Sequence, residues 1–129
     1  MARVLVIDDD DAVRTAIKLL LETDGYEVFS ASNGHEGMRT AQATEVDLVI
    51  VDIFMPGMDG IETIRTLRSY RPAVPIVAIS GAMSGKDKES SPDFLSIATK
   101  FGAVTSLPKP FRPRELLDIA RRALTPGVE

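Results

Sequence analysis

Three short runs of mostly β-branched apolar residues constrain the fold more than any other feature of this chain. They cover residues 4–7, 46–51 and 74–79, and they hardly alternate with polar residues. Strands without such alternation are buried on both faces, as in a parallel sheet that helices cover. Two weaker strand candidates lie at residues 27–31 and 104–107.

The segments between these runs carry apolar residues at helical spacing, three or four positions apart. The clearest stripe consists of Val13, Ala16, Ile17, Leu20 and Leu21, and further stripes occupy residues 38–41, 61–67, 94–101 and 116–124. Asn33 with Glu36 forms a candidate capping box, and Gly25 lies where the first helix should end. The order strand–helix, repeated five times, predicts an α/β fold with a doubly wound, five-stranded parallel sheet and five helices.

The length of 129 residues fits a single domain over residues 1–129, with residues 125–129 as a short tail. The chain has no cysteine, which excludes disulfides and zinc–thiolate sites and fits the reducing cytoplasm. The net charge of −4 argues against nucleic acid as a partner. The apolar runs are far shorter than the ~20 residues that a membrane helix needs, so we expect no membrane partner.

Polar side chains follow the predicted strands at their carboxyl ends, where open α/β sheets bind ligands. Asp8 and the three aspartates after it follow the first run, and Asp52 follows the second. Ser80 follows the third run, and Lys109 follows the last strand after one proline. We therefore expect carboxylates, a hydroxyl and an ammonium group to meet at one rim of the sheet.

Carboxylates that crowd together raise one another's pKa unless a cation lies between them. Magnesium is a hard cation that accepts a few carboxylates while it keeps waters and a phosphate oxygen. The ammonium group of Lys109 and the hydroxyl of Ser80 suit the remaining oxygens of a phosphoryl group. The pattern therefore predicts a phosphoryl group beside Mg²⁺, with one aspartate as the nucleophile that carries it.

Taken together, these motifs resemble the receiver domain of two-component response regulators over residues 4–124. The resemblance rests on Asp8-Asp9 after the first strand, Asp52 in the segment VDIFMPGMDG, Ser80 after the fourth strand, and Lys109-Pro110-Phe111 after the fifth. Each motif alone is weak, but the set in this order is specific. It implies a flavodoxin-like sheet with strand order 2-1-3-4-5. Pro108 then falls on an edge strand, where a residue without an N–H donor is tolerated.

The resemblance implies that Asp52 is the phosphoacceptor, which takes a phosphoryl group from a histidine kinase or a histidine phosphotransfer protein. Asp8, Asp9 and Asp52 would hold Mg²⁺, with the backbone carbonyl of Phe54 as a further ligand. Lys109 would pair with the phosphoryl group. The peptide bond between Lys109 and Pro110 would be cis. Such a domain is no enzyme in the usual sense, because it catalyses only its own phosphorylation and dephosphorylation.

The same resemblance implies a switch. Ser80 would swing toward the phosphoryl group, and a surface for a downstream protein would change, or the group would pass along a relay. The sequence does not identify that protein, and a homodimer stays open. The family usually has an aromatic residue at the position of Ser106. Phe101 or Phe111 could take the role of that aromatic ring. The polar loop 81–93 is longer than usual, so we expect it to be mobile and the output surface to differ from the common one.

Two alternatives stay open. Asp8-x-Asp10 superficially matches the nucleophile motif of haloacid-dehalogenase phosphatases, but Ala12 stands where that motif has Thr or Val, and Asp52 would have no role. A degenerate receiver would bind partners without phosphorylation, and the complete set of acceptor residues argues against it. His35 is the only histidine. Its place in a first helical turn indicates a surface residue rather than a phosphohistidine donor.

Overall fold

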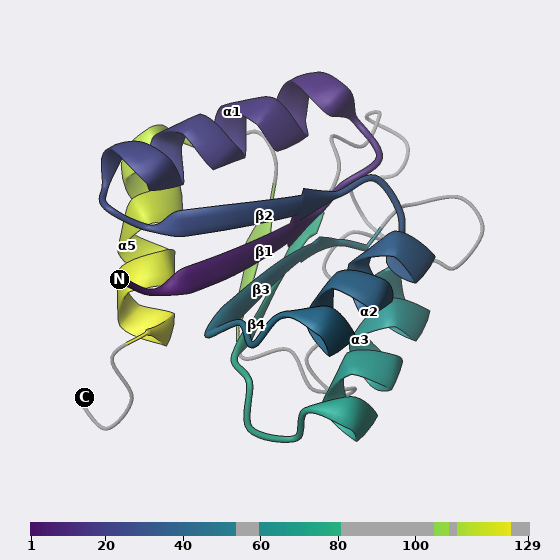
Figure 1. The fold of residues 1–129 in the computed structure, drawn as a ribbon. Helices are drawn as coiled ribbons and strands as arrows, with labels where there is room; N and C mark the ends of the chain where they lie inside the picture. The colour runs from purple at the N-terminus through teal and green to yellow at the C-terminus, as the bar shows by residue number, and fades with distance from the viewer. Residues whose placement is uncertain (54–59, 81–104, 109–110, 125–129) are drawn as a thin grey trace.

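The described part of the chain forms a parallel sheet of five strands with helices on both faces (Figure 1). The computed structural model describes residues 1–53, 60–80, 105–108 and 111–124. In these residues the elements are β1 (Arg3–Ile7), α1 (Asp11–Thr23), β2 (Glu27–Ala31), α2 (Gly34–Ala43), β3 (Leu48–Asp52), α3 (Gly60–Tyr70), β4 (Ile76–Ser80), β5 (Thr105–Pro108) and α5 (Pro113–Ala123). The strand order is β2-β1-β3-β4-β5.

The two central strands, β1 and β3, are buried on both faces, as their unbroken apolar runs predict. Residues 4–7 and 48–51 are all 0% exposed. Leu5 and Ile7 pack into the cluster under α2 and α3, whereas Val4 and Val6 pack into the cluster under α1 and α5. Figure 1 shows α1 and α5 on one side of the sheet and α2 and α3 on the other. The predicted doubly wound parallel α/β fold is therefore confirmed.

The starts of β3 and β4 lie two residues later than predicted, whereas other strand ends shift by one residue at most. Val46 and Val74 are buried, but they lie before β3 and β4 rather than in them. The ladders begin at Leu48 and Ile76. Asp47 interrupts the second run because its carboxylate turns back to accept from the Arg3 amide at 2.8 Å. Pro75 interrupts the third run because proline has no N–H to donate to a ladder.

Helix α1 buries a narrower face than its predicted stripe. Ile17 and Leu21 are buried, and Val13 and Leu20 pack at the edge of the same core. Ala16 is exposed, contrary to the prediction. It lies beyond Leu20 around the helix, and its methyl group is too short to reach back to the sheet. The helix ends as predicted, because Gly25 adopts a φ of 94°, which favours glycine.

The edge position of β5 agrees with the proline at its end, since Pro108 is the last residue of that strand. Four helices lie in the described residues. The remaining predicted helix, over the stripe 94–101, lies outside those residues, as do the loop 81–93 and the Lys109–Pro110 bond. None of the described helices combines the length and the apolarity that a membrane crossing requires.

Candidate functional site

Three aspartates meet at the carboxyl end of the sheet, as the sequence predicts. Asp8 directly follows β1, and Asp52 is the last residue of β3. These strands are neighbours, with Ile7 opposite Val51. Asp8, Asp9 and Asp52 each offer one carboxylate oxygen, and these oxygens all lie within 4.8 Å of one another.

Burial gives this cluster its chemical character. Asp8 and Asp52 are only 0% and 3% exposed, whereas Asp9 is exposed. Three carboxylates so close together repel one another. A hard divalent cation between them offsets this repulsion. Two buried oxygens and one at the open side suit Mg²⁺, which keeps part of its coordination shell for water and phosphate oxygens. The donor set therefore fits magnesium.

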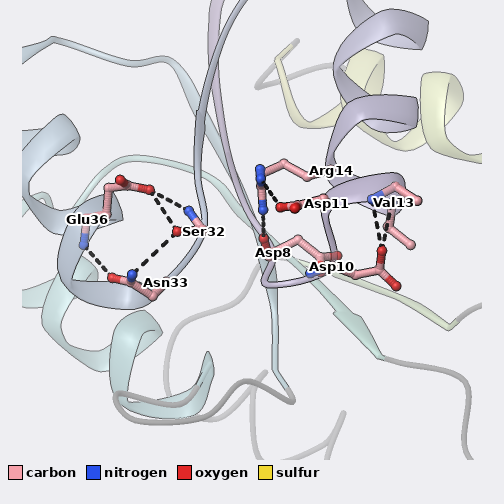
Figure 2. Close-up of polar contacts among 9 residues, drawn as sticks. Asp8, Asp10, Asp11, Val13, Arg14, Ser32, Asn33 and Glu36 are labelled. Carbon is pink, nitrogen blue, oxygen red and sulfur yellow. Dashed lines mark hydrogen bonds and ion pairs between the residues drawn. The ribbon is translucent and has the colours of Figure 1, made fainter.

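Backbone contacts hold Asp8 in place. Its amide donates to the Ala31 carbonyl at the end of β2, at 3.1 Å. Its carboxylate Oδ1 accepts from the Asp10 amide at 2.9 Å, and its carbonyl accepts from Arg14 Nη1 at 2.7 Å (Figure 2). The turn between β1 and α1 is thus fixed from the neighbouring strand and from the helix that follows.

The other two aspartates of the acidic run serve helix α1. Asp10 is its N-cap, and Oδ1 of Asp10 accepts from the amides of Ala12 and Val13 at 2.9 and 3.2 Å. Asp11 pairs with Arg14 in the first turn. Carboxylates at this end of a helix are favoured by the free amides and the helix dipole. The run therefore divides in two, with Asp8 and Asp9 at the cluster and the next two at the helix.

The backbone of the predicted acceptor lies against helix α3. A Cβ atom added to Gly60 would lie 2.2 Å from the Asp52 carbonyl oxygen and 2.1 Å from the Ile53 Cα. Such distances to backbone atoms exclude any side chain at position 60. Only glycine lets the start of α3 approach the end of β3 so closely. Sequence patterns do not reveal this contact, since the glycine looks like an ordinary turn residue.

A second polar group lies on the neighbouring loop between β2 and α2 (Figure 2). Asn33 caps α2 as predicted, with Oδ1 accepting from the Glu36 amide at 2.8 Å. The return bond of the predicted capping box is different. Glu36 Oε1 accepts from the amide of Ser32 at 2.6 Å, one residue before the cap. This backbone donor, followed by the Ser32 hydroxyl, lowers the pKa of Glu36 below its usual 4.5. His35 is exposed, as predicted.

The remaining predicted site residues are described less fully. Ser80 is the last residue of β4, opposite Pro108 of β5, at the same end of the sheet as Asp52. Ser106 lies in β5 opposite Ala78. Lys109 and Phe54 lie outside the described residues. Their roles, and that of the Ser80 side chain, stay predictions.

Comparison with known proteins shows the family of this chain. The sequence matches the response regulator receiver domain family over residues 4–121. The response regulator MprA of Mycolicibacterium vanbaalenii is 36% identical over 122 residues, which cover 95% of this chain and 50% of that protein. The alkaline phosphatase synthesis transcriptional regulatory protein PhoP of Bacillus subtilis is 33% identical over 114 residues, which cover 88% and 45%.

Solved structures show the same relationship. The chemotaxis protein CheY4 of Vibrio cholerae has a TM-score of 0.81 and 33% identity, and the match covers 96% of this chain and 99% of that one. Fold and site together define a signalling domain of the two-component type. The chain belongs to the response regulator receiver domain family. It spans about half the length of the curated relatives it matches, for example 50% of MprA and 45% of PhoP.

Proposed function

We propose that Asp52 is the phosphoacceptor of this receiver domain and takes its phosphoryl group from a phosphohistidine. The observation that carries the proposal is the convergence of Asp8, Asp9 and Asp52 within 4.8 Å, with two of the three carboxylates buried. Family membership supports the same assignment, since receiver domains accept phosphoryl groups and bind Mg²⁺ through acidic residues. Asp8, Asp9, Asp52 and the Phe54 carbonyl are the proposed Mg²⁺ ligands.

The proposed reaction is a displacement at phosphorus. A carboxylate oxygen of Asp52 forms the new P–O bond, and the P–N bond to the donor histidine breaks. The imidazole nitrogen keeps the electron pair and takes up a proton. Bound Mg²⁺ would neutralise charge on the phosphoryl oxygens. Lys109 is proposed to pair with those oxygens, and Ser80 to hydrogen-bond to them.

The proposed output is a change of protein-binding surface. A phosphoryl group adds charge and strong acceptors at the rim of the sheet, which favours one of two existing conformations. The donor is a histidine kinase or phosphotransfer protein, and the receiver of the signal is a downstream protein or the next carrier of a relay. We further propose that residues 1–129 form a single domain with a fifth helix over the stripe 94–101. We also propose that this domain works in the cytoplasm.

Three observations weigh against the alternatives. A phosphatase of the haloacid-dehalogenase type would use Asp10 in its chemistry, but Asp10 accepts two amides as the N-cap of α1. The family match also favours the receiver. A degenerate receiver has no need of three converging carboxylates, so the cluster argues for phosphorylation.

The test is phosphorylation by a small acyl-phosphate donor with Mg²⁺, followed by intact mass. We expect one added phosphoryl group in the wild type and none with EDTA or in Asp52→Ala. Asp47→Ala is the matched control, because Asp47 is an exposed aspartate just before the same strand. Addition to Asp52→Ala would overturn the acceptor assignment. Catalytic consumption of the donor, without a stable adduct, would favour the phosphatase.

A further inference from the structure

The side chain of Arg14 connects helix α1 to the backbone of the β1–α1 turn, which carries two proposed metal ligands. Its Nη1 donates to the Asp8 carbonyl at 2.7 Å, and its Nη2 pairs with Asp11. The Arg14 side chain is largely buried, with only 18% of it exposed. The Asp8 carbonyl belongs to the peptide group that links Asp8 to Asp9. Arg14 therefore holds the peptide group between two proposed Mg²⁺ ligands.

The same turn has two further fixed points. The amide of Asp8 is held by the Ala31 carbonyl, and the Asp8 carboxylate receives the Asp10 amide. The first contact fixes the backbone of Asp8, and the second fixes its carboxylate. The contact from Arg14 fixes the peptide plane on which the direction of the Asp9 side chain depends. Figure 2 shows Arg14 reaching from α1 to Asp8 and Asp11.

Charge alone would give Arg14 the opposite effect. A cation beside a Mg²⁺ site repels the ion, so removing it should strengthen binding. Asp11 offsets part of this charge. The guanidinium also contributes to the low pKa of Glu36 across the turn, so its field extends to the neighbouring loop. Removal of the guanidinium should therefore weaken Mg²⁺ binding if Arg14 positions the ligands, and should strengthen it if Arg14 only repels the ion.

We infer that Arg14 is a positioning residue that sets the geometry of Asp8 and Asp9 and thereby strengthens Mg²⁺ binding. This inference rests on the proposed function of the cluster. Groups that orient metal ligands typically change metal affinity about 10-fold or more when they are removed. Arg14 acts indirectly, through the peptide group between Asp8 and Asp9. We therefore expect the smaller effect on metal affinity, about 10-fold.

The test is the dissociation constant of Mg²⁺, measured by titration calorimetry on Arg14→Lys and Arg14→Met. Lysine keeps the charge, but its single ammonium group cannot reproduce the planar fork that contacts the carbonyl and Asp11 together. We expect both variants to bind Mg²⁺ about 10-fold more weakly. Unchanged binding in both variants would overturn the inference, and tighter binding in Arg14→Met would overturn it in favour of simple repulsion.

Arg121→Met is the matched control. Arg121 Nη2 pairs with Asp24 at 3.2 Å beyond the other end of α1, so this variant also removes a guanidinium that anchors the helix. We expect its Mg²⁺ affinity to equal that of the wild type. Thermal melting without Mg²⁺ shows which variants are folded at the titration temperature, and the milder Arg14→Lys keeps the test valid if Arg14→Met is not.

Phosphorylation separates positioning from a general loss of structure. Saturating Mg²⁺ should restore the extent of phosphorylation of Arg14→Lys to that of the wild type. A persistent defect at saturation with an unchanged Mg²⁺ affinity would contradict the inference. Failure of the wild type to bind Mg²⁺ at all would instead overturn the metal half of the proposed function, so the two failures are distinguishable.

Discussion

Gly60 and Asp52 are in direct backbone contact, with room for no Cβ atom between them. The first residue of α3 thus lies against the carbonyl of the proposed phosphoacceptor. A change at the start of that helix must displace the end of β3, because backbone atoms on both sides cannot move aside as a flexible side chain could. The position of the Asp52 carboxylate is therefore coupled to the packing of α3.

Gly60→Ala should lower the free energy of unfolding by about 3 kcal/mol, the upper range for forcing a methyl group into a packed site. Gly25→Ala is the comparison, since Gly25 has a φ of 94° but nothing within 4 Å of an added Cβ. That variant should lose about 1 kcal/mol from backbone strain alone. Urea unfolding measures both. A Gly60→Ala variant as stable as Gly25→Ala would contradict the close contact.

Mg²⁺ should stabilise the folded protein. An ion that binds only the folded state, at about ten times its dissociation constant, raises the free energy of unfolding by about 1.4 kcal/mol. Asp8→Asn should lose this gain while its Oδ1 still accepts the Asp10 amide. Urea unfolding with and without Mg²⁺ gives the difference. Asp47→Asn, at an exposed aspartate that lies outside the cluster just before β3, should keep the gain.

Glu36 should make stability depend on pH in the acid range. Its pKa is lower in the folded protein than its usual 4.5, mainly because the Ser32 amide binds the ionised form. The stabilisation that ionised Glu36 gives the folded protein is thus fully present above pH 4.5 and is lost as the pH falls through the folded-state pKa. Glu36→Gln should be less stable than the wild type near neutral pH and should lose less stability between about pH 5 and about pH 3.

Chemical unfolding at several pH values measures this effect. Glu22→Gln, an exposed carboxylate on α1, is the control and should follow the wild-type profile. If Glu36→Gln and the wild type lose stability in parallel on acidification, the hydrogen bond from Ser32 does not stabilise the ionised form.

The central strands should carry most of the stability. Ile50 lies in β3 and is 0% exposed, so Ile50→Ala should cost about 3 kcal/mol through lost burial and the cavity left behind. Leu19→Ala is the matched control, because Leu19 lies on α1 and is 58% exposed. Its stability should stay within about 0.5 kcal/mol of the wild type. Equal losses in the two variants would contradict the assigned core.

The fold and the carboxylate cluster are predictable from the sequence for one reason. Runs without alternation must be buried on two faces, and parallel strands place their carboxyl ends at a common rim. Asp8 and Asp52 can thus be brought together without knowing any contact. The strand boundaries at Val46 and Val74 are less predictable, since buried residues just outside a ladder look the same as residues inside it.

The finer contacts depend on how elements far apart in the sequence approach one another. Periodicity shows which face Arg14 occupies, but not that its guanidinium reaches the Asp8 carbonyl. The capping pattern predicts the bond from Glu36 to the loop but misplaces it by one residue, because the exact path of the chain at Ser32 decides which amide lies nearer. The glycine at position 60 does not reveal the close approach of α3 to β3, because a glycine in an ordinary turn looks the same in the sequence.

The three carboxylates come from strands that are neighbours in the sheet but are separated along the chain by α1, β2 and α2. Asp8 and Asp9 alone lie on one local turn, and the third oxygen arrives only when β3 pairs with β1. The unfolded chain therefore has no such site, and a fragment that stops before β3 would have none either. If the cluster binds magnesium as proposed, magnesium affinity would report whether the centre of the sheet has assembled.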